Sequence, residues 1–367
     1  MVRSQTSFDP PNGQHVAKTH GASRGPAGAR GNHTVIQAPT TPSDLARWAF
    51  WVPLRSTLDP KKPTGVHALR KAWYLQWAAA GGSRERMKDE YSRWLGNTLT
   101  ERGYKTLIQH TFRQAWRTHL EELLIGKLSP ETIDQWVQFR GLHHLDQALS
   151  SGKGVVWVYP HAGPVMLMLA GLAHKGYEYT QYAARGLPPE SVAQDHPELL
   201  AGNRWRTAVR ETREANEDQL PAEFLTLDTP VRALHRRLAD NRIVGLAFDG
   251  RIGTGWWPAP FLNRTALLSS GPWKLAVSTG ALVVPAFCHS PVDGPAVVEV
   301  GAPIRPGKNW KKLAISTLSQ QEQWLRQHPE EYGFWMLHTK DRCAIDDHPM
   351  FIDTAPDNRY RRWIPDE

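Results

Sequence analysis

The sequence is poor in cysteine and has no long apolar run. Only two of its 367 residues are cysteines, Cys288 and Cys343, and neither belongs to a Cys-x-x-Cys pair or to a Cys/His spacing typical of zinc sites. These absences disfavour a zinc module and favour a reducing compartment, with a single disulfide left open. We therefore expect no metal and no other resident cofactor.

Because no stretch of about 18 consecutive apolar residues occurs, we expect no transmembrane helix. Residues 1–41 are rich in Gly, Pro, Ser, His and Arg, and they lack the apolar core of a signal peptide. We expect this stretch to be a disordered tail. Residues 341–367 are expected to form an irregular C-terminal tail.

Basic residues and tryptophan are abundant. Lys and Arg number 44 against 36 Asp and Glu, a net charge of +8, and there are 16 Trp residues. The charge favours anionic partners such as phospholipid surfaces, phosphorylated sugars or acidic carrier proteins, and Trp is favoured at membrane interfaces. Nucleic-acid binding is disfavoured, because no recognised motif is present and the basic residues are mixed with acids.

Short apolar runs alternate with helical patterns from about residue 137 to 302. The expected strands are 137–139, 155–159, 179–183, 243–248, 281–287 and 297–300. Such alternation predicts an α/β fold, with a mainly parallel central sheet flanked by helices. We expect one domain over 42–340, with an N-terminal helical part at 42–135 and an α/β core at 136–302.

Two regions outside the strands are predicted in less detail. In the helical part we expect helices at 65–80, 84–99 and 101–125, the last capped by Thr100. Trp48, Phe50 and Trp51 precede them beside basic residues, and these rings suit either an interfacial anchor or packing on the core. Two other stretches are expected to lack strands: a long polar connection at 186–228 and a loop rich in Gly, Pro and Trp at 250–261.

His161 follows the buried strand 155–159 and precedes a helical pattern at 162–172. It therefore lies in a tight turn at the carboxyl end of a strand, the edge of an open α/β sheet where ligands bind. A histidine there can be a general base or a structural turn residue bonded to the backbone. Asp249 ends the strand 243–248 and can reach the same edge, or it can hold the loop that follows.

Several blocks of sequence occur in a fixed order between about residues 45 and 340. They are 128–131, 141–145, 154–161, 243–249, 260–266, 271–272, 280–287 and 324–330. Their joint order resembles the lysophospholipid acyltransferase superfamily, and within it the bacterial lipid A late acyltransferases of the lauroyl and myristoyl type.

The resemblance implies a His and an acid five positions later, with the His deprotonating a hydroxyl that attacks an acyl thioester. His161 is present, but Met166 stands at the fifth position after it, and a thioether cannot replace a carboxylate. Three outcomes are open. Another acid, such as Asp249 or Glu122, reaches His161; His161 acts alone as a weaker base; or the site is silent and the fold is kept for binding.

Four arginines are candidates for binding the substrate. The resemblance places Arg185 near the acceptor head group and Arg264 near the phosphate or thioester end of the site. Arg204 and Arg206 lie at helical spacing in the polar connection, where arginine can grip phosphate. For any single arginine of that connection, a solvated and salt-bridged helix face is the alternative.

The resemblance implies an acyltransferase that moves a fatty acyl group from an acyl carrier protein or acyl-CoA thioester to a hydroxyl of a lipid or glycolipid. The thioester is a co-substrate rather than a cofactor. Because such donors are cytosolic, the protein is expected to be peripheral on the cytoplasmic face of the inner membrane. The alternative is a catalytically degenerate member that binds lipid or a carrier protein.

Overall fold

The computed structural model describes residues 37–96, 98–185, 194, 201–250, 255–339 and 350–352. All of them belong to one compact unit, Ile36–Glu367. Of the tail predicted at 1–41, residues 1–36 lie outside the described part, and of the tail predicted at 341–367 only 350–352 lie inside it.

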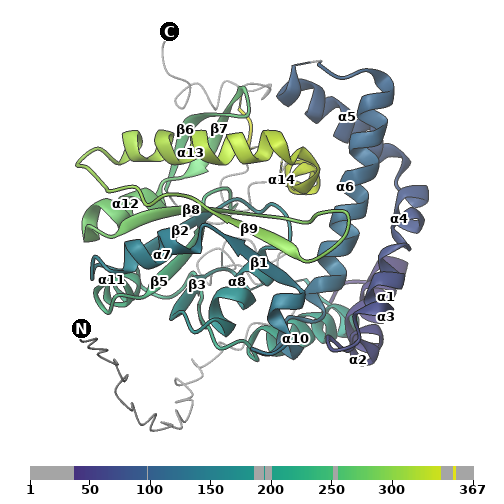
Figure 1. Ribbon diagram of the computed structural model, residues 1–367. Coiled ribbons are helices and arrows are strands. Elements are labelled where there is room, and N and C mark those ends of the chain that lie inside the picture. Colours follow the sequence, from purple (N-terminus) through teal and green to yellow (C-terminus); the bar gives the residue numbers. More distant parts are fainter. Residues whose placement is uncertain are drawn as a thin grey trace, which may run out of the picture. The chain divides into compact units, whose positions relative to one another are not determined.

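Within the described residues, the central sheet has seven strands in the order β1-β9-β8-β2-β5-β3-β4 (Figure 1). Neighbouring strands are parallel except for the antiparallel pair β8 and β9. The six predicted strands are all present, and β4 is additional. Their bounds are β1 Val137–Arg140, β2 Val155–Tyr159, β3 Tyr179–Tyr182, β4 Glu223–Leu225, β5 Ile243–Ala247, β8 Leu282–His289 and β9 Ala296–Val300.

The two faces of the sheet bury different apolar clusters. Along β2, Val156 and Val158 join one cluster, and the alternate residues Val155, Trp157 and Tyr159 join the other. The first face packs against α11 (Arg232–Ala239), α12 (Gly271–Thr279) and α13 (Trp310–Gln327), and the second against α7 (Leu142–Leu149) and α8 (Val165–His174). Coverage of both faces explains why every residue of β2 is buried. The predicted fold class is confirmed.

Helices make up most of the described chain before the sheet. They are α1 Pro42–Ala49, the π-helix η1 Phe50–Leu54, α2 Arg55–Thr57, α3 Pro63–Arg70, α4 Trp73–Ala79, α5 Gly81–Leu95 and α6 Glu101–Glu122, followed by the short turns η2 Ile125–Lys127 and η3 Ile133–Gln135. The predicted cap is confirmed, because the Thr100 hydroxyl accepts the Gly103 N–H at 3.2 Å. The helix predicted at 65–80 is instead two helices, α3 and α4.

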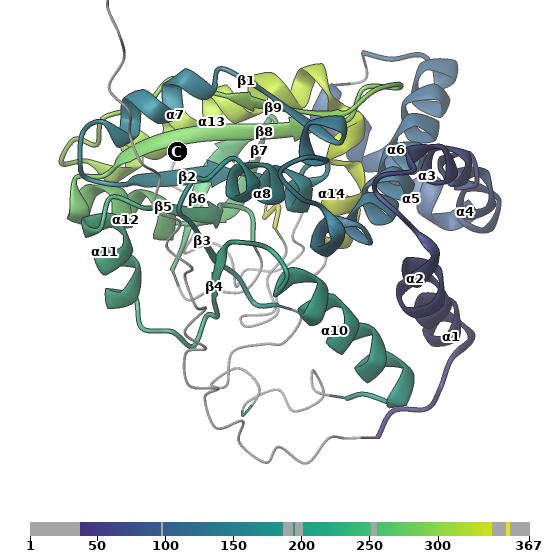
Figure 2. The same ribbon diagram turned by 60° about the horizontal axis from the view of Figure 1, so that its bottom comes forward.

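The aromatic residues of α1 and η1 contact other parts of the protein. Trp48 meets Trp205 edge to face at 4.9 Å, and Phe50 lies 5.5 Å from Trp116. The guanidinium of Arg213 lies over Trp51. These rings therefore pack on α6 and on α10 (Arg204–Glu217), which runs beside α1 (Figure 2). Among the helices described, none combines the length and the apolar character that a bilayer span requires.

The loop predicted at 250–261 is wrong in its second half. Residues Trp256–Phe261 form β6, which pairs antiparallel with β7, Arg264–Ser269. Leu262 and Asn263 make the turn, both at positive φ as a two-residue hairpin turn requires. Two prolines in β6 hide the strand, because proline lacks the N–H that a ladder needs. The connection predicted at 186–228 likewise contains α10 and β4.

Candidate active site

The turn after β2 is fixed by two unusual residues. Pro160 ends the strand, and α8 begins only at Val165 rather than at 162 as predicted. Gly163 has φ +64°, and a Cβ at this position would collide with the Cys288 carbonyl of β8. Only glycine suits both conditions. The Gly163 N–H donates to the Glu331 carbonyl at 3.1 Å, which ties the turn to a segment far along the chain.

The sheet register brings His161 and Asp249 together. In the parallel pair β2 and β5, Tyr159 lies opposite Ala247. His161 and Asp249 each lie two residues beyond these partners, at the carboxyl edge. Equal offsets past paired residues of neighbouring parallel strands place two side chains next to each other. The meeting of these residues therefore follows from which strands are neighbours.

Their contact has the geometry of a base and the acid that orients it. His161 Nδ1 lies 2.7 Å from Asp249 Oδ1, and the His161 backbone N–H donates to both carboxylate oxygens at 3.2 and 3.0 Å. The Asp249 side chain is fully buried, whereas 35% of the His161 side chain is exposed. With the Nδ1 proton directed at the carboxylate, Nε2 on the opposite side of the ring is the nitrogen able to accept a proton.

A C-terminal segment completes the surroundings of the pair. It comprises η5, Pro329–Glu331, Tyr332, and α14, Gly333–Thr339. The buried Tyr332 hydroxyl donates to Asp249 Oδ2 at 2.9 Å, and the Trp335 ring stacks on the His161 imidazole at 3.9 Å and 17°. The sequence prediction missed both residues. Its only signal was the block 324–330, which ends just before them.

The other acid considered for His161 lies elsewhere. Glu122 is at the end of α6, where its carboxylate is 3.8 Å from His119. Met166 is the second residue of α8 and packs at the edge of the apolar cluster on that face. The acid that contacts His161 is thus Asp249.

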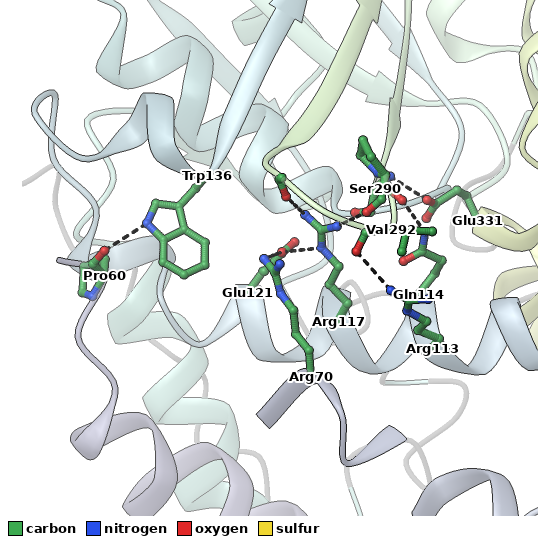
Figure 3. Close-up of polar contacts among 12 residues, drawn as sticks. Pro60, Arg70, Arg113, Gln114, Arg117, Glu121, Trp136, Ser290, Val292 and Glu331 are labelled. Atoms are coloured by element: carbon green, nitrogen blue, oxygen red, sulfur yellow. Dashed lines mark hydrogen bonds and ion pairs between the residues drawn. The ribbon is translucent and has the colours of Figure 1, made fainter. Parts of the chain in front are cut away.

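Glu331 is a second buried carboxyl close to the turn. Its Oε1 accepts the Ser290 N–H at 2.6 Å, and burial away from water raises its pKa to about 8. Figure 3 shows this contact beside two side chains of α6, Gln114 and Arg117, that bond to backbone carbonyls after β8. The end of β8, α6 and η5 are therefore joined by polar contacts behind the turn.

Three of the four predicted arginines contact acids or rings of the helical layers. Arg185 bonds to Glu217 at 2.9 Å and to Asp218 at 2.7 Å, both at the end of α10. Arg206 bonds to Asp44 of α1 at 2.8 Å. Arg204, which is exposed, lies over Trp205. The alternative of a salt-bridged helix face is observed for Arg206, and a role of these residues in binding substrate stays a prediction.

Arg264 is buried in β7. It pairs with Glu90 of α5 at 2.7 Å and lies 3.9 Å above the Phe351 ring. It also lines a cavity of about 500 Å³ between the β6–β7 hairpin and α13. Its prediction as a substrate-binding residue remains a prediction, and its observed contacts are those of a structural ion pair.

Of the two cysteines, Cys288 is a buried free thiol in β8, and Cys343 lies outside the described residues. Burial raises the pKa of the Cys288 thiol well above its usual value, so it stays protonated at neutral pH. In the described part of the chain, His, Cys, Asp and Glu side chains form no group of three that could hold a metal ion.

Three known proteins match parts of this chain. Phosphatidylinositol mannoside acyltransferases from two strains of Mycobacterium tuberculosis are each 31% identical over 152 residues, covering 40% of this chain and 42% of the relative. The protein of the same description from Mycolicibacterium smegmatis is 26% identical over 223 residues, covering 60% of this chain and 67% of the relative. The chain thus spans about two fifths of the length of the M. tuberculosis proteins that it matches.

A family sequence model covers more of the chain. The model described as bacterial lipid A biosynthesis acyltransferase matches residues 70–340, a range that contains the sheet, His161, Asp249 and Tyr332. The match extends over well more than half of the chain, and it agrees with the order of blocks seen in the sequence. The chain therefore belongs to the bacterial lipid A biosynthesis acyltransferase family.

Proposed function

We propose that this protein transfers a fatty acyl group from a thioester, on coenzyme A or an acyl carrier protein, to a hydroxyl of a lipid or glycolipid. The observation that carries the proposal is the His161–Asp249 pair, with a 2.7 Å contact between a partly exposed imidazole and a buried carboxylate. Family membership supports acyl transfer as the reaction class.

In the proposed step, Nε2 of neutral His161 removes the proton of the acceptor hydroxyl as its oxygen attacks the thioester carbonyl carbon. A tetrahedral intermediate forms, and its C–S bond then breaks. The leaving thiolate takes this proton from Nε2, which regenerates the neutral ring. Asp249 holds the Nδ1 proton, fixes the tautomer and stabilises the transient imidazolium.

Asp249 would thus do the work of the acid that the family motif has five positions after the histidine, where this chain has Met166. The carboxylate follows β5 instead of lying in α8. It nevertheless provides the acceptor that the Nδ1 proton of His161 needs. This substitution of one acid for another favours an active enzyme over the degenerate member.

A lipid or glycolipid acceptor is supported by the relatives, whose names specify phosphatidylinositol mannosides. The net charge of +8 suits an anionic membrane surface or an acidic carrier protein. We place the protein as a peripheral enzyme on the cytoplasmic face of the inner membrane, where thioester donors occur. No nucleic acid and no resident cofactor enter this proposal.

The test is transfer of a radiolabelled acyl chain to a bacterial lipid extract, with acyl-CoA and acyl carrier protein as alternative donors. His161→Ala should lower the rate by about 10²–10⁴-fold, the range of general-base catalysis. His110→Ala, which removes an exposed histidine of α6, is the matched control and should transfer normally.

Equal transfer by the wild type and His161→Ala would reject His161 as the base. Absence of transfer by the wild type, together with binding to lipid vesicles or to acyl carrier protein, would instead establish the degenerate binding member.

A further inference from the structure

The segment 331–335 contacts both residues of the His161–Asp249 pair and the turn that carries His161. The Glu331 carbonyl accepts the Gly163 N–H of the turn, the Tyr332 hydroxyl donates to Asp249, and the Trp335 ring covers His161. Backbone, acid and base are each contacted by a different residue of five consecutive positions. Tyr332 immediately precedes α14, and Trp335 is the third residue of that helix.

Tyr332 is the most informative of these residues. Its side chain is fully buried and its hydroxyl is 2.9 Å from Asp249 Oδ2, while Oδ1 receives the His161 ring at 2.7 Å. The two oxygens of one carboxylate therefore have different side-chain partners, while the His161 backbone N–H donates to both of them. A hydrogen bond on Oδ2 fixes the rotation of the carboxylate and draws negative charge away from Oδ1.

We infer that Tyr332 is a positioning residue of the proposed acyl transfer, which acts on His161 through Asp249. It holds the carboxylate so that Oδ1 points at Nδ1, and it limits how strongly the carboxylate retains a proton on the imidazole. This role rests on the proposed function for its catalytic consequence. Its effect on the imidazole itself is independent of any substrate.

The effect has a definite sign. Removal of the Tyr332 hydroxyl leaves more negative charge on Asp249, so the charged imidazolium is held more strongly and the ring becomes neutral only at higher pH. Removal of the carboxylate charge in Asp249→Asn has the opposite result. Among the residues that the structure describes, two further titratable groups near the pair are Tyr159 of β2, which interacts electrostatically with Asp249, and Glu331 beside Gly163. Both are retained in these variants.

The test measures the reactivity of His161 directly. Only neutral imidazole reacts with diethylpyrocarbonate, and the 35% exposure of the His161 side chain makes it accessible. Peptide mass spectrometry distinguishes modified His161 from the other 15 histidines of the chain. The midpoint of the rate against pH should rise in Tyr332→Phe by roughly half a pH unit and fall in Asp249→Asn.

Tyr179→Phe is the matched control. Tyr179 is equally buried, but its hydroxyl donates to Gln181 at 2.9 Å instead of to the pair. A merely structural effect of losing a buried tyrosine hydroxyl would appear in both variants, and only Tyr332→Phe should move the His161 midpoint. If Tyr332→Phe fails to fold, 3-fluorotyrosine at position 332 keeps the ring and donates a stronger hydrogen bond, so the midpoint should fall.

The transfer assay supplies the second readout. Tyr332→Phe should lower kcat by about tenfold, as expected for a hydrogen bond to a charged group, and leave KM for the thioester nearly unchanged. A wild-type midpoint in Tyr332→Phe would overturn the inference even if the wild type transfers acyl groups. A shifted midpoint in a protein that transfers nothing would support the role of Tyr332 and reject the proposed function.

Discussion

Two pairs of an acidic and a basic side chain in this protein differ in one respect that separates chemistry from structure. In the Arg264–Glu90 pair, both side chains are nearly inaccessible, at 3% and 2% exposure. In the His161–Asp249 pair, the acid is equally buried, but 35% of the imidazole is exposed. The closed pair holds helix α5 to strand β7. A pair with one accessible end can exchange a proton with a bound molecule.

Burial alone therefore does not mark a functional site. Both pairs have short contacts, and both include a residue matching a family block in the sequence. What differs is an accessible ring nitrogen that can accept a proton, which the guanidinium of arginine cannot do.

Asp249→Asn should abolish most catalysis while leaving the fold intact. Asparagine keeps the shape of the carboxylate but cannot stabilise the imidazolium, and its amide favours the wrong tautomer of His161. We expect kcat to fall by about 10³–10⁴-fold. Glu122→Gln, which changes the acid beside His119, is the control and should retain wild-type transfer. A large loss in the control alone would assign the acid role to Glu122.

Arg264→Ala should destabilise the protein instead. It leaves the Glu90 carboxylate buried without this partner, so we expect the free energy of unfolding to fall by about 3–5 kcal/mol. Urea unfolding measures the loss. The double variant Arg264→Met with Glu90→Leu removes both charges and should recover most of it. If the double variant folds but recovers neither stability nor acyl transfer, the result would show that Arg264 binds the substrate.

Glu331→Gln tests the buried carboxyl behind the turn. The folded-state pKa of Glu331 is raised to about 8, so the folded protein keeps a proton that the unfolded chain releases near pH 4.5. Stability contributed by this group therefore falls as pH rises through this window. Relative to the wild type, the free energy of unfolding of the variant should be higher at pH 8 than at pH 5 by roughly 3–4 kcal/mol. An equal difference at both pH values would contradict the burial effect.

Arg206→Ala should have the smallest effect, because 42% of the Arg206 side chain is exposed. Its bond to Asp44 lowers the pKa of that carboxyl, so the stability it contributes is present at neutral pH and is lost in acid, as Asp44 becomes protonated. Urea unfolding should show a small deficit for the variant at pH 7 that disappears in acid. A deficit that persists in acid would point to lost packing rather than lost charge.

Parts of the fold were predictable because local patterns agreed with the tertiary environment. β2 and β8 are buried throughout, and both are apolar runs in the sequence. The hairpin β6–β7 was missed because prolines and a turn without glycine conceal it. β4 has only three residues and is partly exposed at the edge of the sheet, so its sequence is too short to give a strand signal.

For the candidate site, the sequence alone predicted that His161 and Asp249 each follow a buried strand, because both strands are short apolar runs. The presence of Met166 five positions after His161 is likewise read from the sequence alone. Only the tertiary structure decided that β2 and β5 are neighbours in matching register, which makes Asp249 the acid at His161.

The structure likewise decided that Tyr332 and Trp335 surround the pair, although they lie far beyond it in the chain. The physical reason is that strand order and the docking of α14 depend on the packing of apolar faces from the whole chain. No local pattern encodes which of several such faces will meet.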